Sequence, residues 1–171
     1  MRTLEALIAV SRLKFLVGGV LGVALGTLAA RHQGFVVLWP AWAIAQGVVT
    51  SFQLMTHYSN EYFDQACDAL ATRTPFSGGS GVLHARLLHE RTVLFLAIAM
   101  LGCGMVFATL GFRFGTLAPM IAVLIAFLAW FYSAPPLRFH SRALGEVNTA
   151  IVVGLLVPAL AYAMQTRTFS L

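Results

Sequence analysis

The chain has 171 residues, of which 59% are hydrophobic and only 10% are charged. Because soluble domains carry about 25% charged residues, an ordinary soluble fold is excluded. The net charge is +5, but the basic residues lie at the ends of apolar segments and form no basic patch, which argues against nucleic acid as a partner. Composition and charge therefore predict a protein whose solvent is the lipid bilayer.

Five apolar segments follow one another along the chain. Each approaches or exceeds the roughly 20 helical residues that cross a hydrocarbon layer of about 30 Å. The segments are continuously apolar, whereas the strands of a membrane barrel alternate, so helices are predicted. The predicted fold class is all-α, a polytopic transmembrane helical bundle. Its spans are expected near residues 13–31, 35–56, 92–112, 114–133 and 147–164.

The segment that leads into the first predicted span, residues 3–14, mixes apolar with charged side chains. This pattern predicts a short interfacial helix. Three glycines in the span, Gly18, Gly22 and Gly26, are four residues apart, an arrangement that lets membrane helices pack closely. Residues 27–30 imitate a signal-peptide cleavage site, but the four further spans favour an uncleaved first helix.

The distribution of basic residues indicates how the spans are oriented. A cytoplasmic N-terminus leaves only Arg31, Arg113 and Arg167 outside, and the positive-inside rule selects this orientation. Both long polar loops, residues 57–91 and 134–146, then lie on the same cytoplasmic face. The two cysteines are predicted to be free thiols, since neither faces an oxidising compartment.

The first polar loop concentrates acidic residues. Half of the six acidic residues lie between Asn60 and Asp68. Because Asn60, Asp64 and Asp68 are four residues apart, on a helix they form one oxygen-bearing stripe with about 6 Å between neighbours. Mg²⁺ binds proteins through one or two carboxylates and completes its shell with water and phosphate oxygens. The stripe therefore predicts a Mg²⁺ site at these three residues, with a diphosphate ester as its ligand and with Asp64 and Asp68 as catalytic residues.

Two other interpretations of this loop stay open. The acids could merely solvate the end of a helix, although ionisable residues at a membrane boundary tend to be functional. His57 and Glu61 are also four residues apart and could ligate a transition metal. No second pair with this spacing occurs on another span, which argues against the transition-metal interpretation.

Basic and small residues elsewhere in the two loops are candidates for holding the diphosphate. The residues predicted to bind it are Arg73, Tyr132 and Arg138. Supporting contacts are predicted from Ser77, Gly78, Gly79 and Arg142. The glycine and serine run can expose backbone N–H groups to an anion. It lacks the lysine of a P-loop, so ATP-type binding is not predicted.

These motifs resemble those of the UbiA superfamily of intramembrane prenyltransferases. The first aspartate-rich motif of that family has the form N-x-x-x-D-x-x-x-D after the second span, which Asn60, Asp64 and Asp68 match. The sequences of four segments are more similar to the 1,4-dihydroxy-2-naphthoate polyprenyltransferase branch than to the 4-hydroxybenzoate or haem O branches. These segments are residues 60–64 (NEYFD), 73–79 (RTPFSGG), 132–136 (YSAPP) and 144–146 (LGE).

The resemblance implies Mg²⁺-dependent transfer of a prenyl group from a polyprenyl diphosphate to an aromatic acceptor, as in menaquinone or ubiquinone biosynthesis. It implies nine spans and a second aspartate-rich motif that supplies the other half of the site, so residues 1–171 are expected to be the N-terminal part of one membrane prenyltransferase domain, and whether this part catalyses the transfer by itself stays open. An integral protein of the bacterial inner membrane is expected. The alternative is a non-catalytic or transporter-like membrane protein fragment, although a transporter would place charged residues within its spans.

Overall fold

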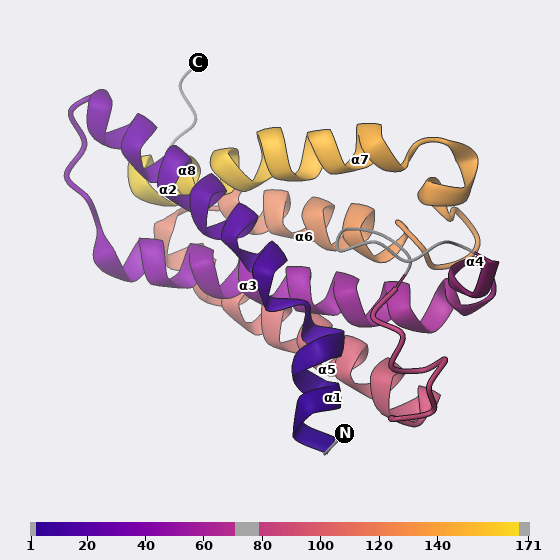
Figure 1. Ribbon diagram of the computed structural model, residues 1–171. Coiled ribbons are helices and arrows are strands. Elements are labelled where there is room, and N and C mark those ends of the chain that lie inside the picture. The colour runs from indigo at the N-terminus through magenta and orange to yellow at the C-terminus, as the bar shows by residue number, and fades with distance from the viewer. Residues whose placement is uncertain (1–2, 71–78, 168–171) are drawn as a thin grey trace.

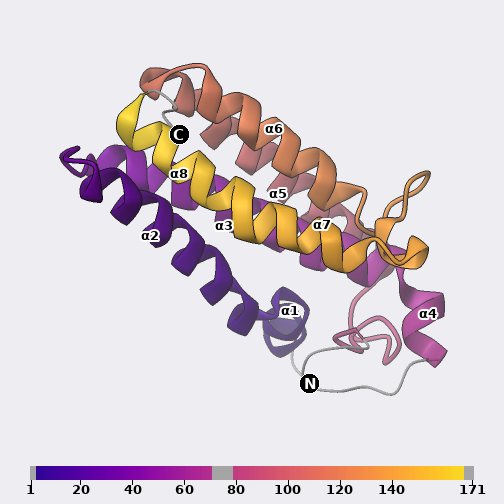
Figure 2. The ribbon, with the colours of Figure 1, turned by 90° about the horizontal axis from the view of Figure 1, so that it is seen from above.

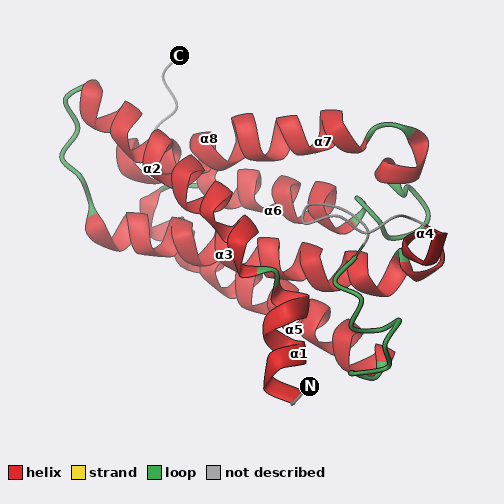
Figure 3. Ribbon diagram, viewed as in Figure 1, coloured by secondary structure: helices red, strands yellow, loops and turns green. Residues whose placement is uncertain are grey.

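The computed structural model describes residues 3–70 and 79–167, and over these residues the chain is all-helical, as predicted (Figure 3). The elements in chain order are α1 (Thr3–Ser11), η1 (Leu13–Phe15), α2 (Leu16–His32), α3 (Trp39–Phe63), α4 (Gln65–Leu70), α5 (Glu90–Leu110), η2 (Gly111–Phe114), α6 (Leu117–Trp130), η3 (Phe139–Arg142), α7 (Gly145–Ile151), η4 (Val152–Leu156) and α8 (Val157–Thr166). The first three η elements are 3-10 turns, and η4 is a π-helical turn. Because α7, η4 and α8 continue one another, they form one long helix.

The long helix α3 lies at the centre of the bundle and packs against α2, α5, α6 and α8 (Figures 1 and 2). Helix α5 runs beside α3, and α2 pairs with α8. The α2–α3 connection lies at one end of the bundle (Figure 1). Helix α4, residues 79–89 and the loop between α6 and α7 lie at the other end. The two loops that carry the predicted site residues therefore share one end of the molecule.

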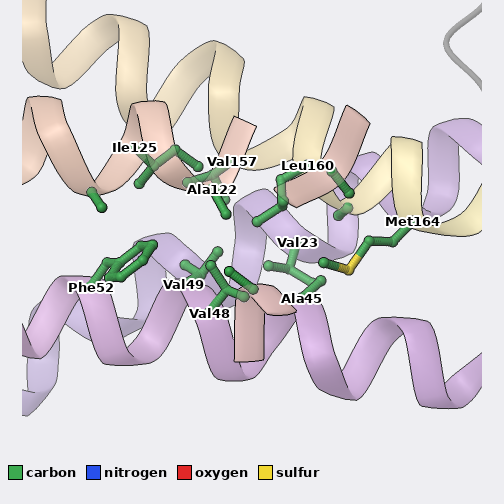
Figure 4. Packing of buried hydrophobic residues seen from close by; sticks show 14 of the residues in the cluster. Val23, Ala45, Val48, Val49, Phe52, Ala122, Ile125, Val157, Leu160 and Met164 are labelled. Carbon is green, nitrogen blue, oxygen red and sulfur yellow. The ribbon is translucent and has the colours of Figure 1, made fainter. Parts of the chain in front are cut away.

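The core forms where one face of α3 meets its neighbours (Figure 4). Ala45, Val48 and Phe52 of α3 are buried and recur every three or four residues, so they lie on the same face. Ile125 from α6 and Leu160 from α8 are buried in the same cluster. Many remaining core positions are alanines, whose small side chains let helices approach closely. These are Ala41, Ala108, Ala118, Ala122, Ala126, Ala129, Ala161 and Ala163.

Among the described residues, three helical segments are long and apolar enough to cross a membrane: Thr3–His32, Glu90–Phe114 and Gly145–Thr166. Each of the five predicted ranges contains a helix, but the count of five spans is not confirmed. Helix α3 has 25 residues but is more polar than the other long helices, and α6 has only 14 residues. Several polar side chains of α3 donate hydrogen bonds within the protein: Gln46 donates to Thr50, and Thr56 donates to the Phe52 carbonyl. A helix enclosed by others needs less apolar surface than one that faces lipid.

Arg12 separates α1 from the helices that follow. Its φ of 45° is left-handed, which an α-helix of L-residues does not accommodate, so α2 takes a new direction (Figure 1). Ala6 and Val10 of α1 are buried against the bundle, whereas Leu4 and Ile8 are exposed. The short helix predicted ahead of the first span is therefore present, and its exposed apolar side chains suit a membrane interface.

Two of the three regularly spaced glycines of α2 lie against the long C-terminal helix. A Cβ at Gly22 would come within 2.8 Å of Val157, and a Cβ at Gly26 would collide with the Pro158 carbonyl. A Cβ at Gly18, by contrast, would meet no atom within 4 Å. The close packing predicted from the glycine spacing thus applies to the second and third glycines only.

Replacing Gly26 with Ala is expected to lower the free energy of unfolding by about 1–3 kcal/mol, because the methyl group would force α2 away from α8. Thermal unfolding of the purified protein in detergent measures the change. Gly18→Ala is the matched control on the same helix, and we expect it to be neutral or slightly stabilising. Equal stability of the two variants would contradict the packing of α2 on α8.

Candidate functional site

Asn60 and Asp64 lie where α3 ends. Asn60 is in the last turn of the helix, and Asp64 is its C-cap, with a φ of −99° and a ψ of 8°. The Asp64 N–H donates to the Asn60 carbonyl at 2.9 Å, so helical spacing is kept between these two residues. Asp68 lies on α4, which turns away from α3 (Figure 1). The predicted stripe is therefore not one continuous helix, because the backbone at Asp64 leaves the helical conformation.

Ser133 joins Asn60 and Asp64 from the opposite loop. It is fully buried, and its Oγ lies 2.9 Å from Asn60 Oδ1 and 2.5 Å from Asp64 Oδ2. A hydroxyl has one proton to donate. The Ser133 hydroxyl therefore donates to one of these two oxygens at a time, and its contact with Asp64 Oδ2 is the shorter one. The two oxygen-bearing side chains thus converge on one point, as the stripe predicted for this pair.

The surroundings of Asp64 disfavour its charged form relative to an exposed aspartate. Burial raises the pKa of Asp64 above its usual value of 3.8, and the nearby Asp68 carboxylate raises it further. The Ser133 hydrogen bond, His140 and Arg138 act in the opposite direction without cancelling the rise in pKa. A cation bound at Asp64 would offset this rise in pKa, because it would stabilise the charged carboxylate.

His140 lies beside the other oxygen of the Asp64 carboxylate. Its Nε2 lies 3.3 Å from Asp64 Oδ1, near enough for an ion pair but not aligned as a hydrogen bond. Its Nδ1 lies 3.1 Å from the Tyr132 carbonyl, which can only accept, so Nδ1 carries a proton. The imidazole also stacks on the Tyr132 ring, with 5.8 Å between centroids. A Cβ at Gly145 would lie 3.1 Å from His140 Cα and 3.2 Å from the Tyr132 hydroxyl, so a side chain there would crowd this stack.

The residues of the second loop that were predicted to contact the diphosphate differ in burial and in their partners. Tyr132 is half-buried, and burial followed by the charge of Asp64 raises the pKa of its hydroxyl. Arg138 is exposed and near enough to Asp64 to lower the pKa of that carboxyl. Arg142 donates to the Pro136 carbonyl at 3.0 Å, so its guanidinium is engaged within its own loop. The structure brings Tyr132 and Arg138 to Asp64 but gives Arg142 a structural partner.

Glu61 is buried and binds residues outside the Asn60 and Asp64 cluster. Only 3% of the residue is exposed, and its carboxylate accepts hydrogen bonds from the Ser80 N–H at 2.8 Å and the Ser80 hydroxyl at 2.7 Å. The Arg12 guanidinium lies 3.4 Å away. His57 contacts the Ser11 carbonyl through Nδ1 at 2.8 Å. The alternative pairing of His57 with Glu61 on a transition metal is not supported, since each has a different partner.

The glycine and serine run is described only in part. Arg73, Ser77 and Gly78 lie outside the described residues. Gly79 has a left-handed φ of 70°, and a Cβ there would collide with the Asp68 carboxylate. Gly79 therefore lies directly against Asp68.

A cavity of about 440 Å³ adjoins the site and lies between α2, α3, α6 and the long C-terminal helix. Asn60, Tyr132 and Arg12 contribute polar groups to its lining. Phe52 and Ile125 belong to its predominantly apolar wall. A volume of this size suits a small ligand, and its lining suits one that has a polar group and an apolar body.

The donor set fits Mg²⁺ better than a transition metal. Among the described residues, no group of three or more His, Cys, Asp or Glu side chains converges on one point. Asn60, Asp64 and Asp68 carry amide and carboxylate oxygens, and Mg²⁺ needs only one or two carboxylates from the protein. Burial raises the pKa of Asp64 and the Asp68 carboxylate raises it further, and a cation bound between the two would favour their charged forms.

The raised pKa of Asp64 predicts how stability depends on pH in the absence of metal. A carboxyl whose pKa is higher in the folded state stabilises the fold below its unfolded pKa, and this contribution is lost as the pH rises through the folded value. The wild type is therefore expected to lose stability relative to Asp64→Asn as the pH rises from about 4. Unfolding midpoints of both proteins across this pH range test the prediction, which parallel curves would contradict.

Sequence reasoning missed Ser133, His140 and Ser80. Ser133 and His140 lie within or beside motifs that were recognised, but their side chains carried no spacing signal of their own. Ser80 belongs to a run whose glycines suggested anion binding, whereas its hydroxyl binds Glu61. The one available signal was Glu61, because a buried acid on a central helix requires hydrogen-bond donors from elsewhere in the chain.

Comparison of the chain with family models, with curated proteins and with solved structures finds no match. The function therefore has to be inferred from the residues of the site and their geometry.

Proposed function

We propose that this protein takes part in Mg²⁺-dependent transfer of a prenyl group from a polyprenyl diphosphate to an aromatic acceptor within a membrane. The observation that carries the proposal is the pair of convergent oxygen donors, Asn60 and Asp64, beside a cavity with a mainly apolar lining. A diphosphate ester with an apolar tail has this same division between a charged head and a hydrocarbon body.

The head group would be held at the end of α3. Asn60, Asp64 and Asp68 would bind Mg²⁺, which supplies the positive charge that stabilises a departing diphosphate. Arg138 lies near Asp64 and would add a charge-assisted hydrogen bond to a phosphate oxygen. Arg73 is proposed for the same role from its place in the sequence. Tyr132 lines the cavity and would donate its hydroxyl proton to the same group.

Ser133 and His140 would position the Asp64 carboxylate. Both contact it from the second loop, so its two oxygens are oriented before any ligand arrives. Pre-oriented groups of this kind stabilise developing charge without having to reorganise during the reaction.

The cavity would hold the hydrocarbon part of the substrate. Val49, Phe52 and Ile125 offer apolar contacts, and they would keep water away from the carbon atom from which the diphosphate departs. Excluding water protects a reactive cation from hydrolysis. The aromatic acceptor would approach from within the same cavity.

The finer assignments belong to the same proposal. We infer membership of the UbiA superfamily and a role in quinone biosynthesis from the resemblance of residues 60–68 and 132–146. Five spans with a cytoplasmic N-terminus in the bacterial inner membrane are inferred from the apolar segments and the positive-inside rule. The three apolar helical segments support insertion into a membrane.

The experiment that tests the proposed function uses the purified chain in liposomes with farnesyl diphosphate and a phenol as acceptor. We expect inorganic diphosphate and prenylated phenol to appear in equal amounts with Mg²⁺ and neither to appear with EDTA. Failure to form product, or equal product formation in EDTA, would contradict the proposal for this chain.

A further inference from the structure

His57 lines the cavity one helical turn before Asn60, and none of the roles described so far uses it. Residues three apart on a helix share a face and differ by about 4.5 Å along the axis. His57 is therefore near the proposed diphosphate site without belonging to it. Arg12 and Phe15 line the same part of the cavity.

The contacts of His57 define which ring nitrogen is free to bind a ligand. Its Nδ1 lies 2.8 Å from the Ser11 carbonyl, and a carbonyl can only accept, so Nδ1 carries the proton. In the neutral ring, Nε2 then has a lone pair. Among the described residues, none forms a hydrogen bond with Nε2.

The imidazole is held in this orientation from two sides. Ser11 is itself fixed, because its hydroxyl lies 2.7 Å from the Leu7 carbonyl and 2.8 Å from the Tyr58 hydroxyl. The ring of Phe15 meets the imidazole edge to face, with 6.1 Å between centroids. The protein thus fixes the tautomer and the plane of His57 and leaves the acceptor Nε2 for a donor that the ligand must bring.

We propose that His57 Nε2 accepts a hydrogen bond from the hydroxyl of the aromatic acceptor and thereby selects phenols over their ethers. The proposal rests on the proposed function, since it assigns the group that recognises the second substrate. A phenol whose proton is directed at an imidazole lone pair has more electron density on its oxygen and ring. His57 would therefore orient the acceptor and also make its ring carbon a better nucleophile.

The test compares two probes that differ in one hydrogen-bond donor, 4-propylphenol and 4-propylanisole. Binding of each to the complete 171-residue chain in nanodiscs is measured by calorimetry. We expect the wild type to bind the phenol roughly tenfold more tightly than the ether, as one net hydrogen bond provides. In His57→Asn, the amide can still donate to the Ser11 carbonyl but offers no acceptor at the Nε2 position, so the preference should disappear. A wild type without preference, or an Asn variant that keeps it, would overturn the proposal.

A second readout does not depend on how the variant folds. In wild type labelled with ¹⁵N-histidine, the Nε2 signal of His57 should shift when the phenol is added and should not shift with the ether. No difference between the two probes would also overturn the proposal. Because phenol binding requires neither Mg²⁺ nor diphosphate, Asp64→Asn should keep the preference. Selective phenol binding without prenyl transfer would contradict the proposed function alone, and transfer without phenol selectivity would contradict the role of His57 alone.

Discussion

Replacing Asp64 with Asn is expected to slow Mg²⁺-dependent release of diphosphate from farnesyl diphosphate at least about a hundredfold, as loss of one oriented charge-stabilising group does. The variant keeps the size of the side chain and a donor towards Ser133. It loses the negative charge that would hold the cation. The initial rate of diphosphate release in liposomes at saturating Mg²⁺ measures the effect.

The neighbouring Gln65 provides the control for this substitution. Gln65 is exposed, and its side chain donates only to the Tyr62 carbonyl, at 2.9 Å. Gln65→Ala is therefore expected to leave the rate of diphosphate release unchanged. An Asp64→Asn protein as fast as Gln65→Ala would show that Asp64 is not a metal ligand in the reaction.

Replacing Glu61 with Ala is expected to lower the free energy of unfolding by about 3 kcal/mol or more, the usual effect of breaking a buried ion pair. The substitution would leave the Arg12 guanidinium and both donors of Ser80 without their carboxylate partner. It would also release α1 and the loop after α4 from the end of α3, because Glu61 joins all three. Thermal and chemical unfolding in detergent measure the loss.

Glu90 is the matched control for Glu61. It is an exposed acid in the first turn of α5, where its favourable interaction with the helix dipole is worth below about 1 kcal/mol. Glu90→Ala should therefore change stability far less than Glu61→Ala. If the two variants unfold at the same temperature, the carboxylate of Glu61 does not hold the three segments together.

The helices and the pairing of Asn60 with Asp64 were predictable from the sequence because both depend on residues close together in the chain. Apolar segments separated by prolines and charges mark helices directly. Spacing by four brings two side chains to one helix face wherever the helix persists. The continuity of the helix as far as Asp68 was not predictable, because one residue, Asp64, adopts a non-helical ψ, and no composition rule identifies that residue in advance.

Contacts between segments that are distant in the chain could not be predicted from sequence patterns. Ser133 meets Asp64 across 69 positions of the chain, and Arg12 meets Glu61 across 49. Such pairs depend on how α3, α6 and the α1–α2 junction pack, and packing is decided by the fit of many side chains together. The count of spans depends on the same packing, since several polar side chains of α3 have partners within the bundle rather than in lipid.

The most direct test of a metal site at the end of α3 is uptake of Mn²⁺, whose free form gives an electron paramagnetic resonance signal. In the presence of farnesyl diphosphate, the wild-type protein is predicted to remove Mn²⁺ from solution beyond what the diphosphate binds alone. Asp64→Asn is predicted to lose this uptake, whereas Gln65→Ala should retain it. Equal uptake of Mn²⁺ by wild type and Asp64→Asn would contradict the assignment of Asn60 and Asp64 to a metal and diphosphate site.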